Sequence, residues 1–122
     1  TLADNCYYQM FYNCTGLTTA PELPATTLAD NCYYQMFYNC TGLTSAPELP
    51  ATTLVNRCYY QMFRNCSSLN EVTTYANDIS ASSCIYNWLN GVSASGTFYN
   101  YGSATYPSGA SGIPSGWTEV KP

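Results

Sequence analysis

Apolar residues near the start of the chain recur at a spacing of three or four positions. Between Cys6 and Cys14 the apolar positions hold Met10 and Phe11, and the intervening residues are tyrosine or polar. On an α-helix this spacing places the four side chains on one stripe. The pattern therefore predicts a short amphipathic helix over residues 6–14.

Polar and turn-forming residues mark the ends of this predicted helix. Asp4 and Asn5 precede it as candidate N-caps, and Gly16 follows it as a candidate C-terminal cap. Residues 17–20 (LTTA) have strand character, whereas the prolines of residues 21–24 (PELP) favour extended backbone and lack N–H donors. Such a unit cannot bury its own apolar face, so we expect another unit to cover it.

The unit recurs at a fixed interval along the chain. Residues 27–52 repeat residues 1–26 with a single change, Thr19 to Ser45, a third copy begins at residue 53, and an eroded fourth begins near residue 79. The first cysteine of each unit recurs at the same constant interval, at Cys6, Cys32, Cys58 and Cys84. A period of about 20–29 residues is typical of leucine-rich repeats, whose units stack into a solenoid.

The composition changes after Asn90 to glycine, serine, threonine, tyrosine and proline. Residues 97–99 and 116–120 have strand character, with turn residues between them. A repeat array needs an atypical last unit, because its final core face would otherwise be exposed. We therefore predict an α/β solenoid of short parallel strands and short helices in residues 1–92, and a β-rich C-terminal cap in residues 93–122. The chain opens on a full repeat without a comparable cap, so we expect further units upstream in the natural protein.

The repeat resembles a known family. Its pattern, Cys-x3-Met-Phe-x2-Cys-x2-Leu-x5-Leu-Pro, is similar to the leucine-rich repeats of BspA-like bacterial surface proteins, whose usual unit runs Ile-Gly-x2-Ala-Phe-x2-Cys-x2-Leu and then Ile-Pro. Cys6 takes the place of the isoleucine and Met10 that of the alanine, while Phe11, Cys14 and Leu17 match directly. The departures are a longer unit, a tyrosine where the family often has glycine, and a second cysteine per unit.

The resemblance covers roughly the predicted solenoid and carries implications for fold and setting. It implies a right-handed solenoid, of which this chain is a C-terminal fragment. It also implies a bacterial protein that is extracellular or at the cell surface, or is carried on a phage virion, and that binds host proteins, other cells or glycans.

Composition and charge exclude several classes of function. The 122 residues include no histidine, which removes a Ser-His-Asp triad, a Cys-His dyad and a histidine ligand for zinc, copper or haem. A net charge of -4 argues against binding nucleic acid. No apolar run approaches the roughly 20 residues that span a bilayer, so we expect no direct membrane insertion. No pair of acids has neighbours that would separate their pKa values, and we expect neither enzymatic activity nor a cofactor.

The seven cysteines permit three interpretations. A structural zinc site is disfavoured, because its ligands usually lie about two to four residues apart. Reduced thiols would pack as small hydrophobic residues. Disulfides suit the extracellular setting that the resemblance implies. Pairing within units would leave Cys84 alone, whereas pairing between units leaves only Cys6, whose partner an upstream unit would supply. The predicted disulfides are therefore Cys14–Cys32, Cys40–Cys58 and Cys66–Cys84.

Two carboxylates also recur between the first two units. Asp4 is followed by Asp30, and Glu22 by Glu48. In the third unit the aspartate becomes Asn56, a change that keeps an N-cap and removes a charge. This favours capping over a ladder of calcium sites.

Tyrosine repeats in register and supplies the candidate binding residues. Tyr8 and Tyr12 should point outward from the predicted helix, and their columns comprise Tyr8, Tyr34 and Tyr60, and Tyr12, Tyr38 and Arg64. Repeated aromatic rings form a stacking platform with phenolic hydroxyls for hydrogen bonding. The alternative is that these rings only pack on one another.

These observations predict a non-catalytic, surface-displayed module that binds a protein or a glycan on another surface. The alternatives are a structural rod or filament subunit and a phage tail receptor-binding component. An uncovered first unit exposes apolar columns and unpaired backbone, so end-to-end self-association through this N-terminal unit is a further alternative.

Overall fold

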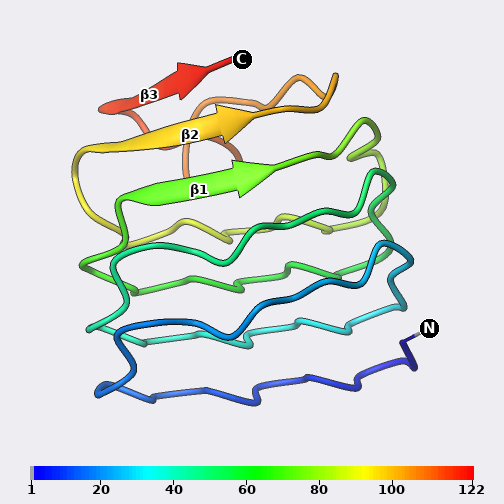
Figure 1. The fold of residues 1–122 in the computed structure, drawn as a ribbon, viewed down its shortest axis with the longest axis horizontal. Helices are drawn as coiled ribbons and strands as arrows, with labels where there is room; N and C mark the ends of the chain where they lie inside the picture. The colour runs from blue at the N-terminus through cyan, green and yellow to red at the C-terminus, as the bar shows by residue number, and fades with distance from the viewer. Residues whose placement is uncertain (1) are drawn as a thin grey trace.

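A computed structural model describes residues 2–122 of the chain. The backbone winds into a stack of rungs, one rung per repeat, with the N-terminus at one end and the C-terminus at the other (Figure 1). Strands β1 (Glu71–Thr74), β2 (Gly96–Asn100) and β3 (Trp117–Val120) form one parallel sheet in the order β1-β2-β3. The predicted stack of repeats with short parallel strands is confirmed at this level.

The helices predicted over residues 6–14 and their copies are wrong, because residues 2–122 contain no helix. This side of each rung is a run of consecutive β-turns, which we call the turn run. Alternate N–H groups donate to the carbonyl three residues back, as from Cys6 to Ala3 at 3.2 Å. The N–H groups between them donate to the next rung, as from Tyr7 to Cys32 at 2.9 Å.

Left-handed backbone at every fourth residue separates this run from a helix. Asn5, Gln9 and Asn13 have φ of 60°, 54° and 62°, whereas an α-helix needs φ near about -63° throughout. A positive φ is what the third residue of a type II turn requires, and asparagine adopts it more readily than most residues. Asn5 is therefore a turn residue rather than a helix cap, and Gly16 does not adopt the left-handed conformation predicted for a C-terminal cap.

The core consists of adjacent pairs of side chains, repeated every four residues along the turn run. In the second rung, Met36 and Phe37 form one such pair, and both are fully buried. The ring of Phe37 stacks between those of Phe11 and Phe63, with centroids 5.5 Å away on each side. Tyr33, which follows Cys32 in the preceding pair, is only 2% exposed. The period of four, in place of 3.6, brings its column into the core.

The strand predicted over residues 17–20 is absent, and so is its copy in the second rung. Both rungs carry two prolines on this side, at Pro21, Pro24, Pro47 and Pro50. A proline has no N–H to donate to a ladder. The proline-free third rung forms β1, and the second rung joins it through a bridge between Leu49 and Thr74. The sheet therefore begins where the prolines end.

The two strands predicted in the C-terminal segment are confirmed, and both extend the same sheet. Strand β2 keeps the register of the repeat, with Thr97 opposite Glu71, its equivalent one repeat earlier. Strand β3 follows at a shorter interval than the repeat, with Trp117 opposite Gly96. The boundary at residue 92 between solenoid and cap stays a prediction.

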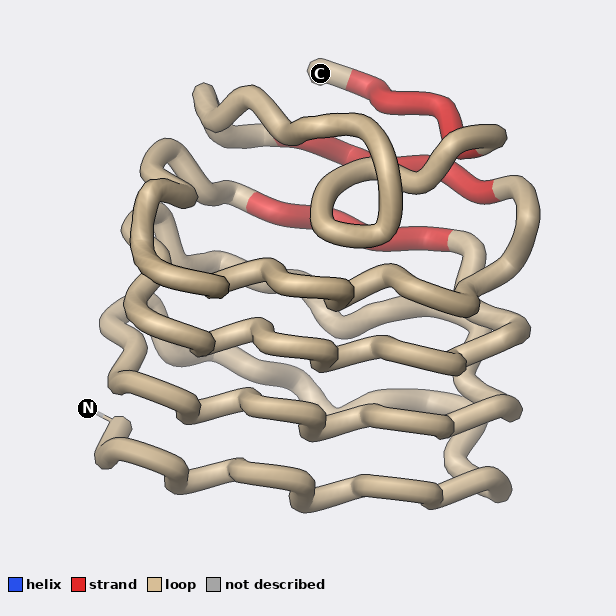
Figure 2. Tube along the Cα trace, turned by 180° about the vertical axis from the view of Figure 1, so that it is seen from behind, coloured by secondary structure: helices blue, strands red, loops and turns tan. Residues whose placement is uncertain are grey.

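The loop between β2 and β3 lies above the turn run of the last rung, on its C-terminal side (Figure 2). The N–H of Leu89 donates to the carbonyl of Ala110 at 3.1 Å. The indole N–H of Trp88 donates to the carbonyl of Gly112 at 2.9 Å. This loop therefore covers backbone and core that the last rung would otherwise expose.

Candidate functional site

The outward side chains of the turn run form a regular surface, which we call the turn face. Each buried pair is followed by a pair of opposite direction, so positions 8, 9, 12 and 13 of the repeat point away from the core, although Gln61 of the third rung is only 8% exposed. With the flanking position 5, the turn face comprises Asn5, Asn31 and Arg57; Tyr8, Tyr34 and Tyr60; Gln9, Gln35 and Gln61; Tyr12, Tyr38 and Arg64; and Asn13, Asn39 and Asn65.

The first predicted tyrosine column forms a stacked ladder on this face. The rings of Tyr8 and Tyr34 are 4.6 Å apart with planes at 6°, and those of Tyr34 and Tyr60 are 4.5 Å apart at 3°. Tyr86 of the fourth rung ends the ladder with an edge contact at 5.0 Å and 64°. Tyr8 is 44% exposed, which is the outward direction expected from the sequence.

The second predicted column is shorter and ends in a cation. Tyr12 and Tyr38 stack at 4.8 Å with planes at 9°, and Tyr12 is exposed. The guanidinium of Arg64 lies over the ring of Tyr38 at 6.0 Å, within the range of a cation–π interaction. The structure thus brings all six predicted binding residues onto one face, in two parallel ladders.

A ladder of glutamine amides separates the two tyrosine ladders, and the sequence analysis did not select it. Gln9 donates from Nε2 to Oε1 of Gln35 at 2.6 Å, and Gln35 donates in the same way to Gln61 at 2.5 Å. On the flank, Asn39 donates from Nδ2 to Oδ1 of Asn13 at 2.9 Å. The signal that could have found these amides is the one that found the tyrosines, an identical residue at an identical place in the repeat.

The geometry of the ladders limits what a ligand can contact. Each stacked ring covers the face of its neighbour, so a ligand meets ring edges and phenolic oxygens rather than open ring faces. Burial raises the pKa of Tyr34, and the neighbouring phenol of Tyr60 raises it to a smaller extent. Its hydroxyl therefore stays protonated at neutral pH and can donate a hydrogen bond. The turn face thus suits hydrogen bonding to a flat, extended partner.

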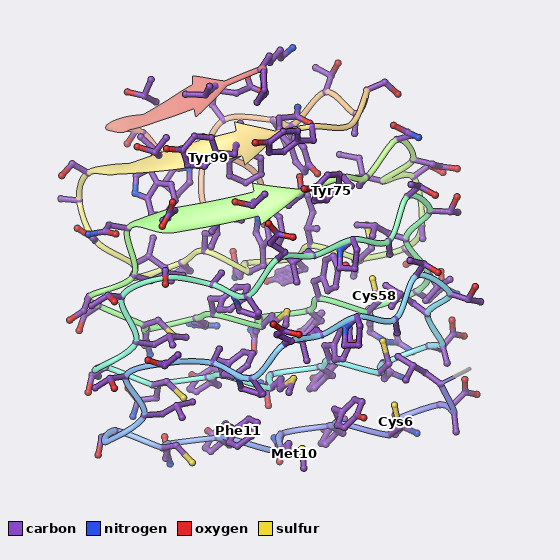
Figure 3. All side chains as sticks on the ribbon, viewed as in Figure 1. Cys6, Met10, Phe11, Cys58, Tyr75 and Tyr99 are labelled. Carbon is purple, nitrogen blue, oxygen red and sulfur yellow. The ribbon has the colours of Figure 1, made fainter. Side chains whose placement is uncertain are left out.

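The cysteines form two columns at opposite ends of the turn run. One column comprises Cys6, Cys32, Cys58 and Cys84, and the other Cys14, Cys40 and Cys66; Figure 3 shows Cys6 and Cys58 on the same side of the stack. All seven are free thiols, so the structure does not contain the predicted disulfides Cys14–Cys32, Cys40–Cys58 and Cys66–Cys84. Each of those pairs would join different columns, because identical rungs place every residue beside its own copy.

Two buried thiols of the first cysteine column are held in their unreactive, protonated state. Burial raises the pKa of Cys32 to about 11 and raises that of Cys58 further. The Sγ of Cys66 donates to the carbonyl of Phe37 at 2.9 Å, and that of Cys40 to Phe11 at 3.0 Å. The hydrogen bond with Cys66 lowers the pKa of Cys40. Since the thiolate is the reactive form, Cys32 and Cys58 act as small core residues.

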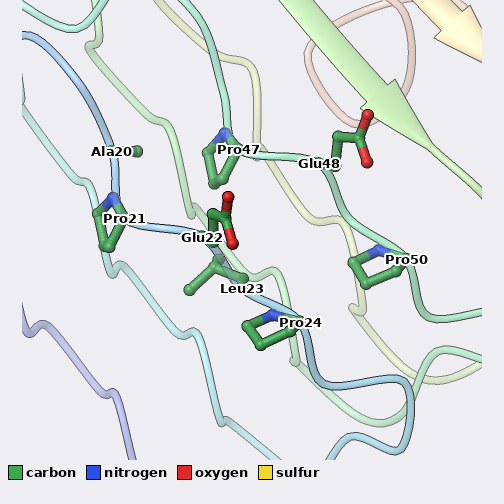
Figure 4. Close-up of a pocket in the computed structure, with 8 residues that line it drawn as sticks. All are labelled: Ala20, Pro21, Glu22, Leu23, Pro24, Pro47, Glu48 and Pro50. Carbon is green, nitrogen blue, oxygen red and sulfur yellow. The ribbon is translucent and has the colours of Figure 1, made fainter.

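A groove lies on the proline side of the stack, between the first two rungs (Figure 4). This groove of about 350 Å³ is lined by Ala20, Pro21, Glu22, Leu23, Pro24, Pro47, Glu48 and Pro50. Its two glutamates lie at the surface, while Leu23 closes its floor as a buried residue. The sequence analysis identified the prolines as favouring extended backbone and did not identify this groove.

Comparison with known proteins finds no match to this chain among family models, curated proteins or solved structures. The described part of the chain has no helix long and apolar enough to cross a membrane. Within the same residues, no group of three or more histidine, cysteine or acidic side chains is placed to hold a metal ion. The resemblance to BspA-like repeats stays a prediction.

Proposed function

We propose that this chain is a non-catalytic binding module that presents the turn face to a protein or glycan on another surface. The setting that accompanies this proposal is extracellular or at a bacterial cell surface. The observation that carries it is the register of the two tyrosine ladders on either side of the glutamine ladder. Together they repeat the same donors and aromatic edges over the first two rungs, and the first tyrosine ladder continues to Tyr60 in the third.

Rigidity supports this role. Each outward pair on the turn face follows a buried pair in the same rung, as Tyr34 and Gln35 follow Cys32 and Tyr33. Stacking and amide bonds immobilise the outward side chains before any partner arrives. Binding then costs little further side-chain entropy, which is a main cost of forming an interface. Tyrosine adds contact area with only about two χ angles to order.

The test is a triple variant, Tyr8→Ser, Tyr34→Ser and Tyr60→Ser, applied to arrays of glycans and surface proteins. We expect affinity for any ligand bound by the parent chain to fall about tenfold or more, as when central aromatic residues of an interface are removed. The matched control is Tyr75→Ser with Tyr101→Ser, a pair stacked at 4.9 Å on the strand side. Unchanged binding by the triple variant, with folding verified by circular dichroism, would rule out the ladder.

The alternative proposal is a rod or filament subunit, or a phage tail component built from the same stack. It is favoured by the regular stacking of the rungs themselves, in which the ring of Phe37 lies 5.5 Å from those of both Phe11 and Phe63. Light scattering across a dilution series separates the two proposals. A binding module keeps one size, whereas a self-assembling rod grows with concentration.

A further inference from the structure

The turn run of the third rung differs in charge from those of the first two. Over positions 4–14 of the repeat, the first two rungs are identical, and the third changes only three residues, to Asn56, Arg57 and Arg64. Asn56 replaces an aspartate, Arg57 an asparagine and Arg64 a tyrosine, so each change adds one positive charge. The buried pairs are unchanged, so packing of the core does not account for the three changes.

Both arginines are held against the second rung by neutral groups. Arg57 donates from Nε to Oδ1 of Asn31 at 3.0 Å. The guanidinium of Arg64 lies over the ring of Tyr38 at 6.0 Å. Neither contact neutralises the positive charge, and no position of the turn face holds a carboxylate. The two charges are therefore fixed in place and remain available to a ligand.

Neutral hydrogen-bonding groups lie between the two guanidinium groups. Tyr34 and Gln35 are half-buried and stand between the residues of the second rung that hold the arginines. Burial raises the pKa of Tyr34, and the positive charge of Arg57 offsets part of that rise, so this charge lies close to the phenol. We call Arg57, Arg64, Tyr34 and Gln35 the arginine site.

The chemistry of the arginine site selects the class of ligand. A guanidinium binds a carboxylate through two parallel hydrogen bonds, and the neutral groups between the arginines suit hydroxyl groups. A nucleic acid carries a charge on every nucleotide, and two cations on a chain of net charge -4 would neutralise few of them. We propose that the arginine site binds a polysaccharide that carries carboxylate groups, with Arg57 and Arg64 as its carboxylate ligands. This inference rests on the proposed binding role of the turn face and names its ligand class.

The test measures binding of the full chain to immobilised polygalacturonate, alginate and hyaluronate. The matched ligand control is fully methyl-esterified polygalacturonate, which keeps the sugar backbone and lacks the charge. We expect at least one acidic polymer to bind about tenfold or more tightly than this neutral ester. Raising NaCl from about 20 mM to about 200 mM should weaken that binding, because salt screens exposed charges. Binding of none of the three acidic polymers would overturn the proposal.

The repeat supplies a variant that removes the arginines and keeps the fold. Arg57→Asn with Arg64→Tyr restores the residues that the second rung holds at these positions. The backbone accepts this change, because Arg57 has φ of 52° and its copy Asn31 has φ of 58°. We expect the double variant to lose about tenfold or more in affinity for the acidic polymer, together with most of the salt dependence. Unchanged affinity would overturn the proposal.

A third variant and a second polymer separate the remaining outcomes. Asn56→Asp keeps an oxygen that accepts the N–H of Ser82, which now lies at 3.1 Å, and returns a carboxylate beside Arg57. We expect it to weaken binding of the acidic polymer while both arginines stay in place. Equal binding of poly-L-glutamate would assign the arginine site to acidic protein segments and would overturn the polysaccharide. A chain that binds only neutral glycans or neutral proteins would overturn this inference and leave the proposed function standing.

Discussion

The clearest prediction concerns Phe37, which lies at the centre of the stack. It is fully buried, and its ring lies 5.5 Å from both Phe11 and Phe63 with planes within 5°. Replacing a buried phenylalanine by alanine removes the transfer free energy of the ring and leaves a cavity, at a cost of about 3–5 kcal/mol. Loss of two aromatic contacts places Phe37→Ala in the upper part of that range, so we expect the free energy of unfolding to fall by about 4–5 kcal/mol.

The repeat supplies a matched control for this substitution. Phe11→Ala is the same change in the same local sequence, because residues 1–18 and 27–44 are identical. Phe11 is only partly buried and stacks on one side, against Phe37. We expect its replacement to cost about half as much or less, since less apolar area and one aromatic contact are lost.

Urea denaturation followed by circular dichroism measures both variants. The free energy of unfolding and the slope with denaturant are compared, and the midpoint of thermal unfolding should fall by about 10–20 °C for Phe37→Ala. Equal losses in the two variants would show that local sequence, and not position in the stack, decides the energy of this ring. That outcome would refute the reasoning from stacked rungs.

Two further predictions follow from close packing and from burial. Gly96→Ala should lower the free energy of unfolding by about 1–3 kcal/mol, because the added Cβ would lie 2.6 Å from both the carbonyl oxygen of Asn70 and the ring of Trp117. The control in the same denaturation assay is Gly16→Ala, whose added Cβ would have no atom within 4 Å. Burial raises the pKa of Cys32 from 9.0 to about 11, so the unfolded state releases this proton first as the pH rises. Stability under reducing conditions should therefore be constant near neutral pH and fall above about pH 9, by on the order of 1 kcal/mol for this thiol near pH 10; stability that rises over this range would contradict it.

Local pattern could not distinguish a helix from the turn run. Apolar residues at Cys6, Met10, Phe11 and Cys14 fit a period of 3.6 and a period of four almost equally over so short a segment. The left-handed backbone at Gln9 is unfavourable for an isolated segment, and it persists because the N–H of Gln9 bonds to the next rung. That bond reaches a residue of the following repeat, so no local propensity reports it. The disulfide prediction failed for a different reason, because it counted unpaired cysteines and did not use the repeat, which already places Cys14 and Cys32 in different columns.

The sequence by itself determined the stack and the membership of its columns. Near-identical units of equal length must place each side chain beside its own copy, which is why the repeat alone is enough to group Tyr8, Tyr34 and Tyr60. Only the tertiary structure decided that the rings cover one another, that glutamine amides form a ladder between them, and that alternate N–H groups of the turn run bond to the next rung. These features arise from backbone conformation and from bonds between rungs, which exist only once the rungs have stacked.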